Sequence, residues 1–236
     1  MQRMLGTVRK AVDKYNMISG GDKIAVGVSG GKDSLVLLTA LSQLREFYPA
    51  LFEVIGISVD PDFGGKSTDF SGVAEYCKKL SVPFIVEKTL LWDIVFKERN
   101  EKNPCSLCSR IRKGALYNAA IRSGCNKVAL GHHMDDAAVT FFMSLLKNGT
   151  LSCFSPVNHL EEKGIDVIRP LVLTREFDTA GAAKKYKMPV IKSGCTESGC
   201  TERSDVAAAL KALGKDYGGL TEKTVGAMMR AHLFGW

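Results

Sequence analysis

The sequence predicts an α/β fold, a doubly wound parallel sheet flanked by helices. Short runs rich in valine and isoleucine alternate along the chain with longer helical patterns. Most of these runs are apolar at successive positions, as strands covered on both faces require. A glycine-rich turn also separates the first run from the helix that follows it, where such sheets bind ligands.

Each element follows from this alternation. The predicted strands span 23–29, 53–60, 83–88, 127–133, 166–172 and 189–194. The predicted helices between and after them span 33–48, 69–80, 105–123, 135–147, 175–187 and 203–213. Residues 89–104 favour a helix leading into a loop.

The pattern divides the chain into three parts. Residues 1–20 form an amphipathic N-terminal helix, and residues 21–213 form the main domain. Residues 214–236 form a C-terminal helical appendage, because three glycines precede a last helical segment.

Composition restricts the function classes. No apolar stretch of about 18 residues occurs and the N-terminus is charged, so we expect no membrane span and no secretory signal. Seven cysteines without an export signal indicate a cytoplasmic protein that keeps sulfur for metal or redox chemistry. The net charge of +7 is compatible with a nucleic-acid partner without requiring one. Basic runs at 9–14, 110–113 and 184–192 fit solvated helix faces as well as phosphate contacts.

The turn "SGGKDS" is a candidate phosphate cradle. Its glycines allow positive φ angles, its backbone N–H groups can face one point, and the following helix N-terminus favours an anion. The stretch contains Ser29, Gly30, Gly31, Lys32, Asp33 and Ser34. It differs from the Walker pattern because an aspartate follows the lysine. The alternative is an ordinary capped turn.

Two further candidate groups follow strands. Asp60 ends one predicted strand, and "GHHMDD" supplies Gly131, His132, Asp135 and Asp136 at another. Because the carboxyl ends of parallel strands share one edge of the sheet, we expect these residues to converge with the glycine turn. As an alternative, the two aspartates only cap their helix.

Cysteines form the third candidate group. Cys105 and Cys108 in "PCSLC" begin a predicted helix with Arg112 nearby, and Cys195 lies far downstream. Three cysteines at one site could hold an iron–sulfur cluster whose remaining iron binds sulfide. A persulfide-forming redox pair and structural zinc are the alternatives. The cysteines at 77, 125 and 153 have apolar neighbours typical of small core residues.

These motifs resemble known families. "SGGKDS" resembles the pyrophosphate loop of the PP-loop ATP-pyrophosphatase superfamily, which splits ATP into AMP and pyrophosphate. With "PCSLC", "GHHMDD" and "CTESGCTER", nearly the whole chain resembles the tRNA 2-thiocytidine synthetase (TtcA) family. The resemblance implies a Rossmann-like sheet of the adenine nucleotide alpha-hydrolase type. It also implies adenylation of the C2 oxygen of an anticodon-loop cytidine, which sulfur then replaces to give 2-thiocytidine.

The resemblance also implies cofactors and partners. These are ATP with Mg²⁺, a [4Fe-4S] cluster on Cys105, Cys108 and Cys195, tRNA, and sulfide or a cysteine desulfurase as sulfur source. Family members are often dimers, so a homodimer is implied as well.

Site roles follow from these expectations. The glycine turn would hold pyrophosphate and help to position Mg²⁺, while Asp60 would contact metal or ribose. Gly131 and His132 would lie against the nucleotide. Of Asp135 and Asp136, one would bind metal while the other acts as acid or base. Arg112 would stabilise charge on the adenylated base or a phosphate.

Two departures keep other functions open. Val139 stands where the family pattern has glutamate, and Cys200 is an unexpected thiol that could be a cluster ligand, a sulfur relay or an unengaged loop residue. One alternative function is thiolation of another tRNA base or a small molecule through a persulfide. The other is a non-catalytic nucleotide-binding iron–sulfur module in sulfur trafficking or redox sensing.

Overall fold

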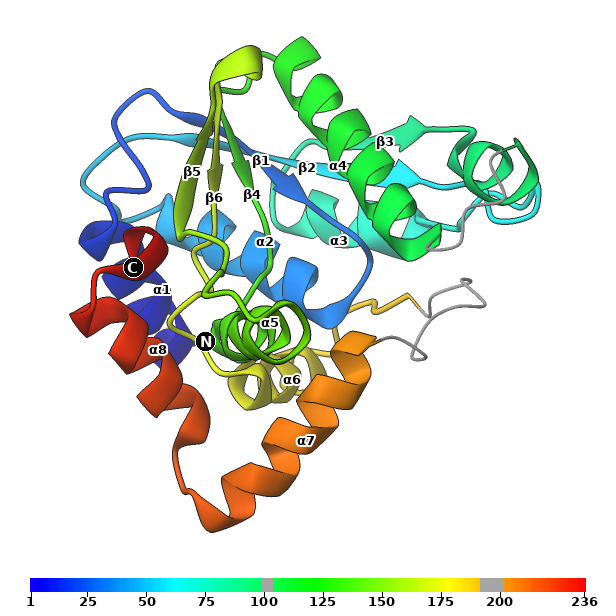
Figure 1. Ribbon diagram of the computed structural model, residues 1–236. Helices are drawn as coiled ribbons and strands as arrows, with labels where there is room; N and C mark the ends of the chain where they lie inside the picture. Colours follow the sequence, from blue (N-terminus) through cyan, green and yellow to red (C-terminus); the bar gives the residue numbers. More distant parts are fainter. Residues whose placement is uncertain (99–103, 192–201) are drawn as a thin grey trace.

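The computed structural model describes residues 1–98, 104–191 and 202–236. A six-stranded sheet lies at its centre, with the order β3-β2-β1-β4-β6-β5 (Figure 1). The strands are β1 Lys23–Gly27, β2 Glu53–Asp60, β3 Phe84–Lys88, β4 Lys127–Ala129, β5 Val157–Leu160 and β6 Ile165–Ile168. All neighbouring pairs are parallel except β5 and β6. The predicted doubly wound α/β fold is confirmed, with one antiparallel edge strand.

Helices cover both faces of this sheet. They are α1 Gln2–Lys14, α2 Lys32–Leu44, α3 Ser71–Lys79, α4 Pro104–Arg122, α5 Met134–Asn148, α6 Glu176–Lys185, α7 Glu202–Asp216 and α8 Leu220–Arg230. Short turns of helix lie at η1 Asp93–Glu98, η2 Glu161–Lys163 and η3 Leu233–Gly235. Within the described ranges, no helix combines the length and apolar character needed to cross a membrane.

Two hydrophobic cores, one on each face of the sheet, hold the helices against it. Helix α2 is buried on nearly every side, since it packs between the sheet and the helices α1 and α6. On the opposite face, α4 packs Leu116, Ala119 and Ala120 against β-strand residues such as Ile57 and Val128. The glycine turn and the loop after β4 lie where these layers meet the carboxyl ends of the strands (Figure 1).

Both ends of the chain join the larger core. Met4, Val8 and Val12 of α1 are buried in it, spaced as an amphipathic helix requires. At the other end, the buried Trp236 donates its indole N–H to the Phe154 carbonyl at 2.9 Å. Helix α7 continues to Asp216, so the predicted boundary at 213 falls inside a helix, and the three-part division stays a prediction.

Four sequence predictions need correction. The predicted strand at 189–194 is not a strand over 189–191, where Ile191 instead donates its N–H to the Gly30 carbonyl at 2.9 Å; residues 192–194 lie outside the described residues. Strand β5 was not predicted, because it is short and carries exposed polar side chains. Strands β4 and β6 end before 133 and 172, since the chain leaves the sheet there to form the site.

Candidate active site

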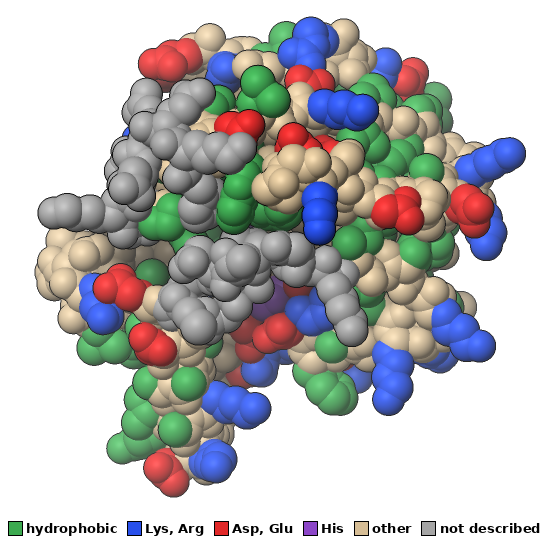
Figure 2. Space-filling model, turned by 90° about the vertical axis from the view of Figure 1, so that its right-hand side faces the viewer, with side chains coloured by type: hydrophobic (Ala, Val, Ile, Leu, Met, Phe, Trp, Pro, Cys, Tyr) green, Lys and Arg blue, Asp and Glu red, His purple; other side chains and the backbone are tan. Residues whose placement is uncertain are grey.

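The candidate site lies at the carboxyl edge of β1, β4 and β6. The glycine turn (residues 29–34) follows β1, residues 130–136 follow β4, and residues 169–176 follow β6. Figure 2 shows acidic, basic and histidine side chains gathered in a hollow at this edge, beside the grey residues. The predicted convergence of the first two segments is confirmed by Gly131, which lies so close to the backbone of Asp33 and Ser34 that an added Cβ would be 3.1 Å from it.

The glycine turn has the backbone of an anion cradle. Gly30 has a φ of +81°, a left-handed conformation that side chains disfavour. Two hydroxyls brace the turn: Ser34 Oγ donates to the Gly31 carbonyl at 2.8 Å, and Ser29 Oγ accepts the Gly31 N–H at 3.2 Å. Helix α2 begins directly afterwards, so its N-terminal N–H groups and partial positive charge adjoin the turn.

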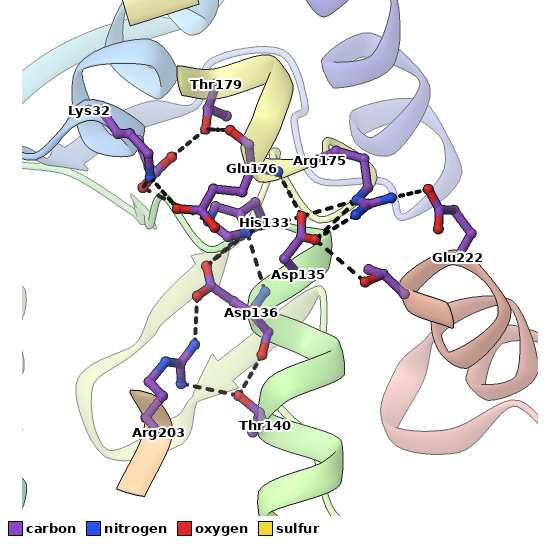
Figure 3. Close-up of polar contacts among 12 residues, drawn as sticks. Lys32, His133, Asp135, Asp136, Thr140, Arg175, Glu176, Thr179, Arg203 and Glu222 are labelled. Carbon is purple, nitrogen blue, oxygen red and sulfur yellow. Dashed lines mark hydrogen bonds and ion pairs between the residues drawn. The ribbon is translucent and has the colours of Figure 1, made fainter. Parts of the chain in front are cut away.

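Lys32 carries the positive charge at the mouth of the turn. Its Nζ lies 2.8 Å from both Asp33 Oδ2 and Glu176 Oε1 (Figure 3). Burial lowers the pKa of Lys32, but the hydrogen bonds that its ammonium donates to these two carboxylates raise it by more. Thr179 donates its hydroxyl to the other Asp33 oxygen at 2.5 Å. The ammonium therefore stays charged and is held between α2 and α6.

Asp136 is both a helix cap and half of an ion pair. Its carboxylate accepts the His133 N–H at 2.9 Å, and His133 Nδ1 accepts the Asp136 N–H at 3.3 Å. The predicted cap at this position is thus present. Arg203 of α7 also donates to Asp136 Oδ1 at 2.6 Å. Burial raises the pKa of Asp136, but His133 and Arg203 lower it below its ordinary value.

Asp135 is engaged by a different arginine. Arg175 donates to it from Nη2 at 2.9 Å, and the Glu176 N–H donates at 2.7 Å. Arg175 also binds Glu222 of α8 (Figure 3). Burial raises the pKa of Asp135, whereas the Arg175 hydrogen bonds lower it by more. Both aspartates are therefore ionised near neutral pH, which favours a metal-ligand or base role over the predicted acid role.

His132 and Asp60 lie in different surroundings. His132 packs on Phe154, with ring centroids 5.1 Å apart, and burial together with nearby Arg169 lowers its pKa to about 4. It is therefore neutral. Asp60 is buried at the end of β2 and accepts the N–H groups of Asp62 and Thr68 at 3.2 Å. Its carboxylate orders its own loop, and its predicted contact with metal or ribose stays a prediction.

The paired cysteines begin α4. Cys105 is exposed and Cys108 half-buried, one helical turn apart, and Arg112 Nη2 lies 3.7 Å from Cys108 Sγ. This spacing suits two ligands of one cluster. Cys195 and Cys200 lie outside the described residues, and the described residues bring no three metal-binding side chains together.

The other thiols fit the predicted core role. Cys77 and Cys125 are buried, and burial raises the pKa of Cys77 and of the half-buried Cys153 to about 11. These thiols are therefore protonated and unreactive at neutral pH.

Sequence analysis missed five residues that the site uses. They are Arg175, Glu176, Thr179, Arg203 and Glu222. The first three follow the predicted strand 166–172, so the rule that ligands bind at strand ends could have found them. Arg203 and Glu222 carry no such signal, because helix packing alone brings α7 and α8 to the site.

Val139, where the family pattern has glutamate, is buried one helical turn after Asp135. It lines a cavity of about 590 Å³ with Ala138, Ala207 and Leu210. The valine therefore joins an apolar contact between α5 and α7.

Comparison with known proteins agrees with this geometry. The PP-loop domain family matches residues 4–190. A tRNA-cytidine(32) 2-sulfurtransferase of Stenotrophomonas maltophilia (strain K279a) is 38% identical over 231 residues, covering 96% of this chain and 74% of the relative. The chain belongs to the PP-loop family of tRNA-cytidine(32) 2-sulfurtransferases.

Other similar proteins extend this comparison. The sulfurtransferase of Syntrophotalea carbinolica is 36% identical, covering 93% of this chain and 85% of the relative. Among solved structures, the U34-tRNA thiolase NcsA from Methanococcus maripaludis with its [4Fe-4S] cluster has a TM-score of 0.78 at 25% identity. The match covers 96% of this chain and 77% of that one. The predicted family is thus confirmed, and both kinds of relative are named for tRNA thiolation.

The substitution Gly131→Ala tests the contact between the two loops. A Cβ at this position would lie 3.1 Å from the Asp33 carbonyl carbon and the Ser34 nitrogen, so backbone must move. We expect a loss of about 1–3 kcal/mol in unfolding free energy and about tenfold weaker ATP binding, measured by urea unfolding and calorimetry. Gly6→Ala, in α1 with open space around it, is the matched control. Unchanged ATP affinity in Gly131→Ala would contradict the assignment of the glycine turn and the loop after β4 to the ATP site.

His132 should make stability depend on pH. The unfolded chain protonates this histidine near pH 6.5, whereas the folded chain leaves it neutral down to about 4. Protons therefore bind preferentially to the unfolded chain in this window. Stability should fall as pH drops from 6.5 to 4, by up to about 3 kcal/mol from this group. Urea unfolding across that range should show a shallower fall for His132→Gln; equal slopes would refute the effect.

Proposed function

We propose that this chain is an ATP-dependent tRNA sulfurtransferase. It adenylates the C2 oxygen of cytidine 32 in the anticodon loop and replaces that oxygen with sulfur, giving 2-thiocytidine, AMP and pyrophosphate. One observation carries the proposal. A candidate phosphate cradle and two ionised aspartates share one edge of the sheet, in a chain whose relatives are named tRNA-cytidine(32) 2-sulfurtransferases.

The glycine turn would hold the phosphates of ATP. Its N–H groups and the α2 N-terminus attract the β- and γ-phosphates, and Lys32 adds a charge that its two carboxylates keep in place. Asp136 is the better of the two aspartates for Mg²⁺, because each of its oxygens accepts one hydrogen bond, from Arg203 and from the His133 N–H. Asp135 is more heavily engaged, since Arg175 and the Glu176 N–H donate several hydrogen bonds to its two oxygens. Asp135 then serves to anchor α6 and α8 beside the turn.

Adenylation would turn the C2 oxygen of cytosine into a good leaving group. The C2 oxygen of cytosine is amide-like and a very poor leaving group, whereas AMP leaves readily. Arg112 lies half-buried on α4 beside Cys108 and can stabilise negative charge near the base. The ionised aspartates keep the ATP side of the site acidic, so Mg²⁺ is favoured there.

Cys105, Cys108 and Cys195 would hold the [4Fe-4S] cluster. The first two lie one turn apart at the start of α4, as two ligands of one cluster require. When bound, the cluster supplies sulfide on the iron that no cysteine ligates.

The remaining partners belong to the same proposal. Sulfide or a cysteine desulfurase would supply sulfur, and the reaction would take place in the cytoplasm. A homodimer is the proposed assembly.

Thiolation with purified components tests the function. The chain, prepared without oxygen and given tRNA, MgATP and sulfide, should form 2-thiocytidine with equal amounts of AMP and pyrophosphate, measured by mass spectrometry of nucleosides. Asp136→Asn removes the charge proposed to hold Mg²⁺ and should slow the reaction about 100-fold. Asp205→Asn, an exposed carboxylate elsewhere on α7, is the control. No pyrophosphate release with any tRNA would refute the proposal.

Metal analysis tests the cluster. Anaerobic protein should contain about four irons and four acid-labile sulfides per chain, and Cys200→Ala should leave both values unchanged while Cys108→Ala lowers them. A cluster lost in Cys200→Ala would make that thiol a fourth ligand and leave no open iron. Absence of iron after reconstitution would replace the cluster by a persulfide route.

A further inference from the structure

A group of basic side chains beside the site is only partly neutralised by the carboxylates of the described residues. Arg169, at the end of β6, lies with its guanidinium carbon 5.1 Å from the centre of the Phe154 ring, on which His132 also packs. Arg169 Nη1 donates to the Ser155 carbonyl at 2.6 Å, but among the residues that the structure describes its buried Nε has no hydrogen-bond partner. The same holds for the buried His132 Nδ1. We call Lys113, His132, Arg169 and Arg203 the basic cluster.

The charges of this cluster repel one another. Burial lowers the pKa of Lys113, and the charges of Arg169 and Arg203 lower it further. Burial also lowers the pKa of Arg169. Within the described residues, Arg203 alone of these three cations has a carboxylate partner, Asp136. Half-buried Arg169, which has no carboxylate partner among the described residues, and the two buried nitrogens without partners there are costly to maintain, so an anion bound here would stabilise the fold.

The cluster opens into a groove. A cavity of about 790 Å³ lies between α4 and the β5–η2 edge of the sheet, on the face that α4 covers only in part (Figure 1). Lys113 is exposed and lines this cavity, so it links the groove to the cluster. The other charged or basic residues that line it are Arg110, His159, Lys163, Glu161 and Glu162. The groove thus runs along the helix whose first turn carries Cys105 and Cys108.

We propose that the basic cluster binds a phosphodiester of the substrate RNA close to the target cytidine. Arg169 and Lys113 would supply the charge, and the groove along α4 would hold the adjoining backbone. This inference rests on the proposed function, since it assumes that tRNA is the substrate. It assigns Lys113 and Arg169 as RNA-positioning residues.

The geometry favours RNA over the phosphates of ATP. The glycine turn, with the α2 N-terminus and Lys32, already provides a cradle for those phosphates. The cluster instead joins α4 to β6, on the side of the sheet where the paired cysteines lie. A groove of this size also suits a polynucleotide better than a single phosphate group.

Binding measurements test the inference without relying on thiolation. Fluorescence anisotropy of a labelled tRNA transcript, without ATP and at several KCl concentrations, gives the dissociation constant and its salt dependence. Lys113→Met and Arg169→Gln should each weaken binding about tenfold and reduce the salt slope by about one. The affinity for a non-hydrolysable ATP analogue should change by less than about twofold, because each substituted cation is proposed to contact an RNA phosphate and not ATP. Lys79→Met, an exposed lysine at the end of α3, is the control.

Three results would overturn the inference: unchanged tRNA affinity and salt slope in both variants, loss of ATP-analogue binding with tRNA binding intact, or no tRNA binding by the unmodified chain. Lys113 is exposed, so we expect the Lys113→Met variant to fold, and its result holds even if the Arg169→Gln variant unfolds. A chain that binds tRNA through the cluster but never thiolates cytidine would leave the inference standing and refute the proposed function. Normal thiolation with unchanged binding in both variants would refute the inference alone.

Discussion

The close approach of the β4–α5 loop to the glycine turn is the constraint on which the site depends. Gly131 lies so near the backbone of Asp33 and Ser34 that a side chain there would collide with them. Because of this contact, the helix N-termini of α2 and α5 lie at the same edge of the sheet. The glycine turn and the aspartates of α5 are therefore close enough together to serve one ligand in the proposed function. The sheet order, with β1 beside β4, makes the approach possible.

Charge balance is the second organising feature. Each aspartate at the mouth of the site is paired with a cation: Asp33 with its neighbour Lys32, and Asp135 and Asp136 with Arg175 and Arg203 from other parts of the chain. The arginine pairs lower the pKa of Asp135 and of Asp136 despite partial burial, and they tie α6, α7 and α8 to the site. In the proposed function, Mg²⁺ would bind an aspartate in place of its arginine, and that arginine would then be available to a phosphate. These ion pairs would thus provide a carboxylate for Mg²⁺ and a cation for a phosphate, both of which the proposed adenylation needs.

The two sides of the carboxyl edge have opposite character. Carboxylates dominate near the glycine turn, whereas Lys113 and Arg169, which have no carboxylate partner among the described residues, lie on the side of α4, β6 and Phe154. A reaction that joins ATP to a nucleic acid needs this separation, because each polyanion must meet its own cations. The paired cysteines lie at the start of α4, on the cationic side.

The sequence alone determined the fold class, the glycine turn, the aspartates after β4 and the cysteine pair, because each is a local pattern of a few residues with its own chemistry. Strand ends and short strands were less predictable, as the polar edge strand β5 and the non-strand 189–191 show. Only the tertiary structure decided the partners of these residues. Arg175 and Arg203 lie 40 and 67 residues from the aspartates they bind, and Arg169 acquires its role from burial. Such pairings depend on how helices pack over the sheet edge, and no local spacing encodes that packing.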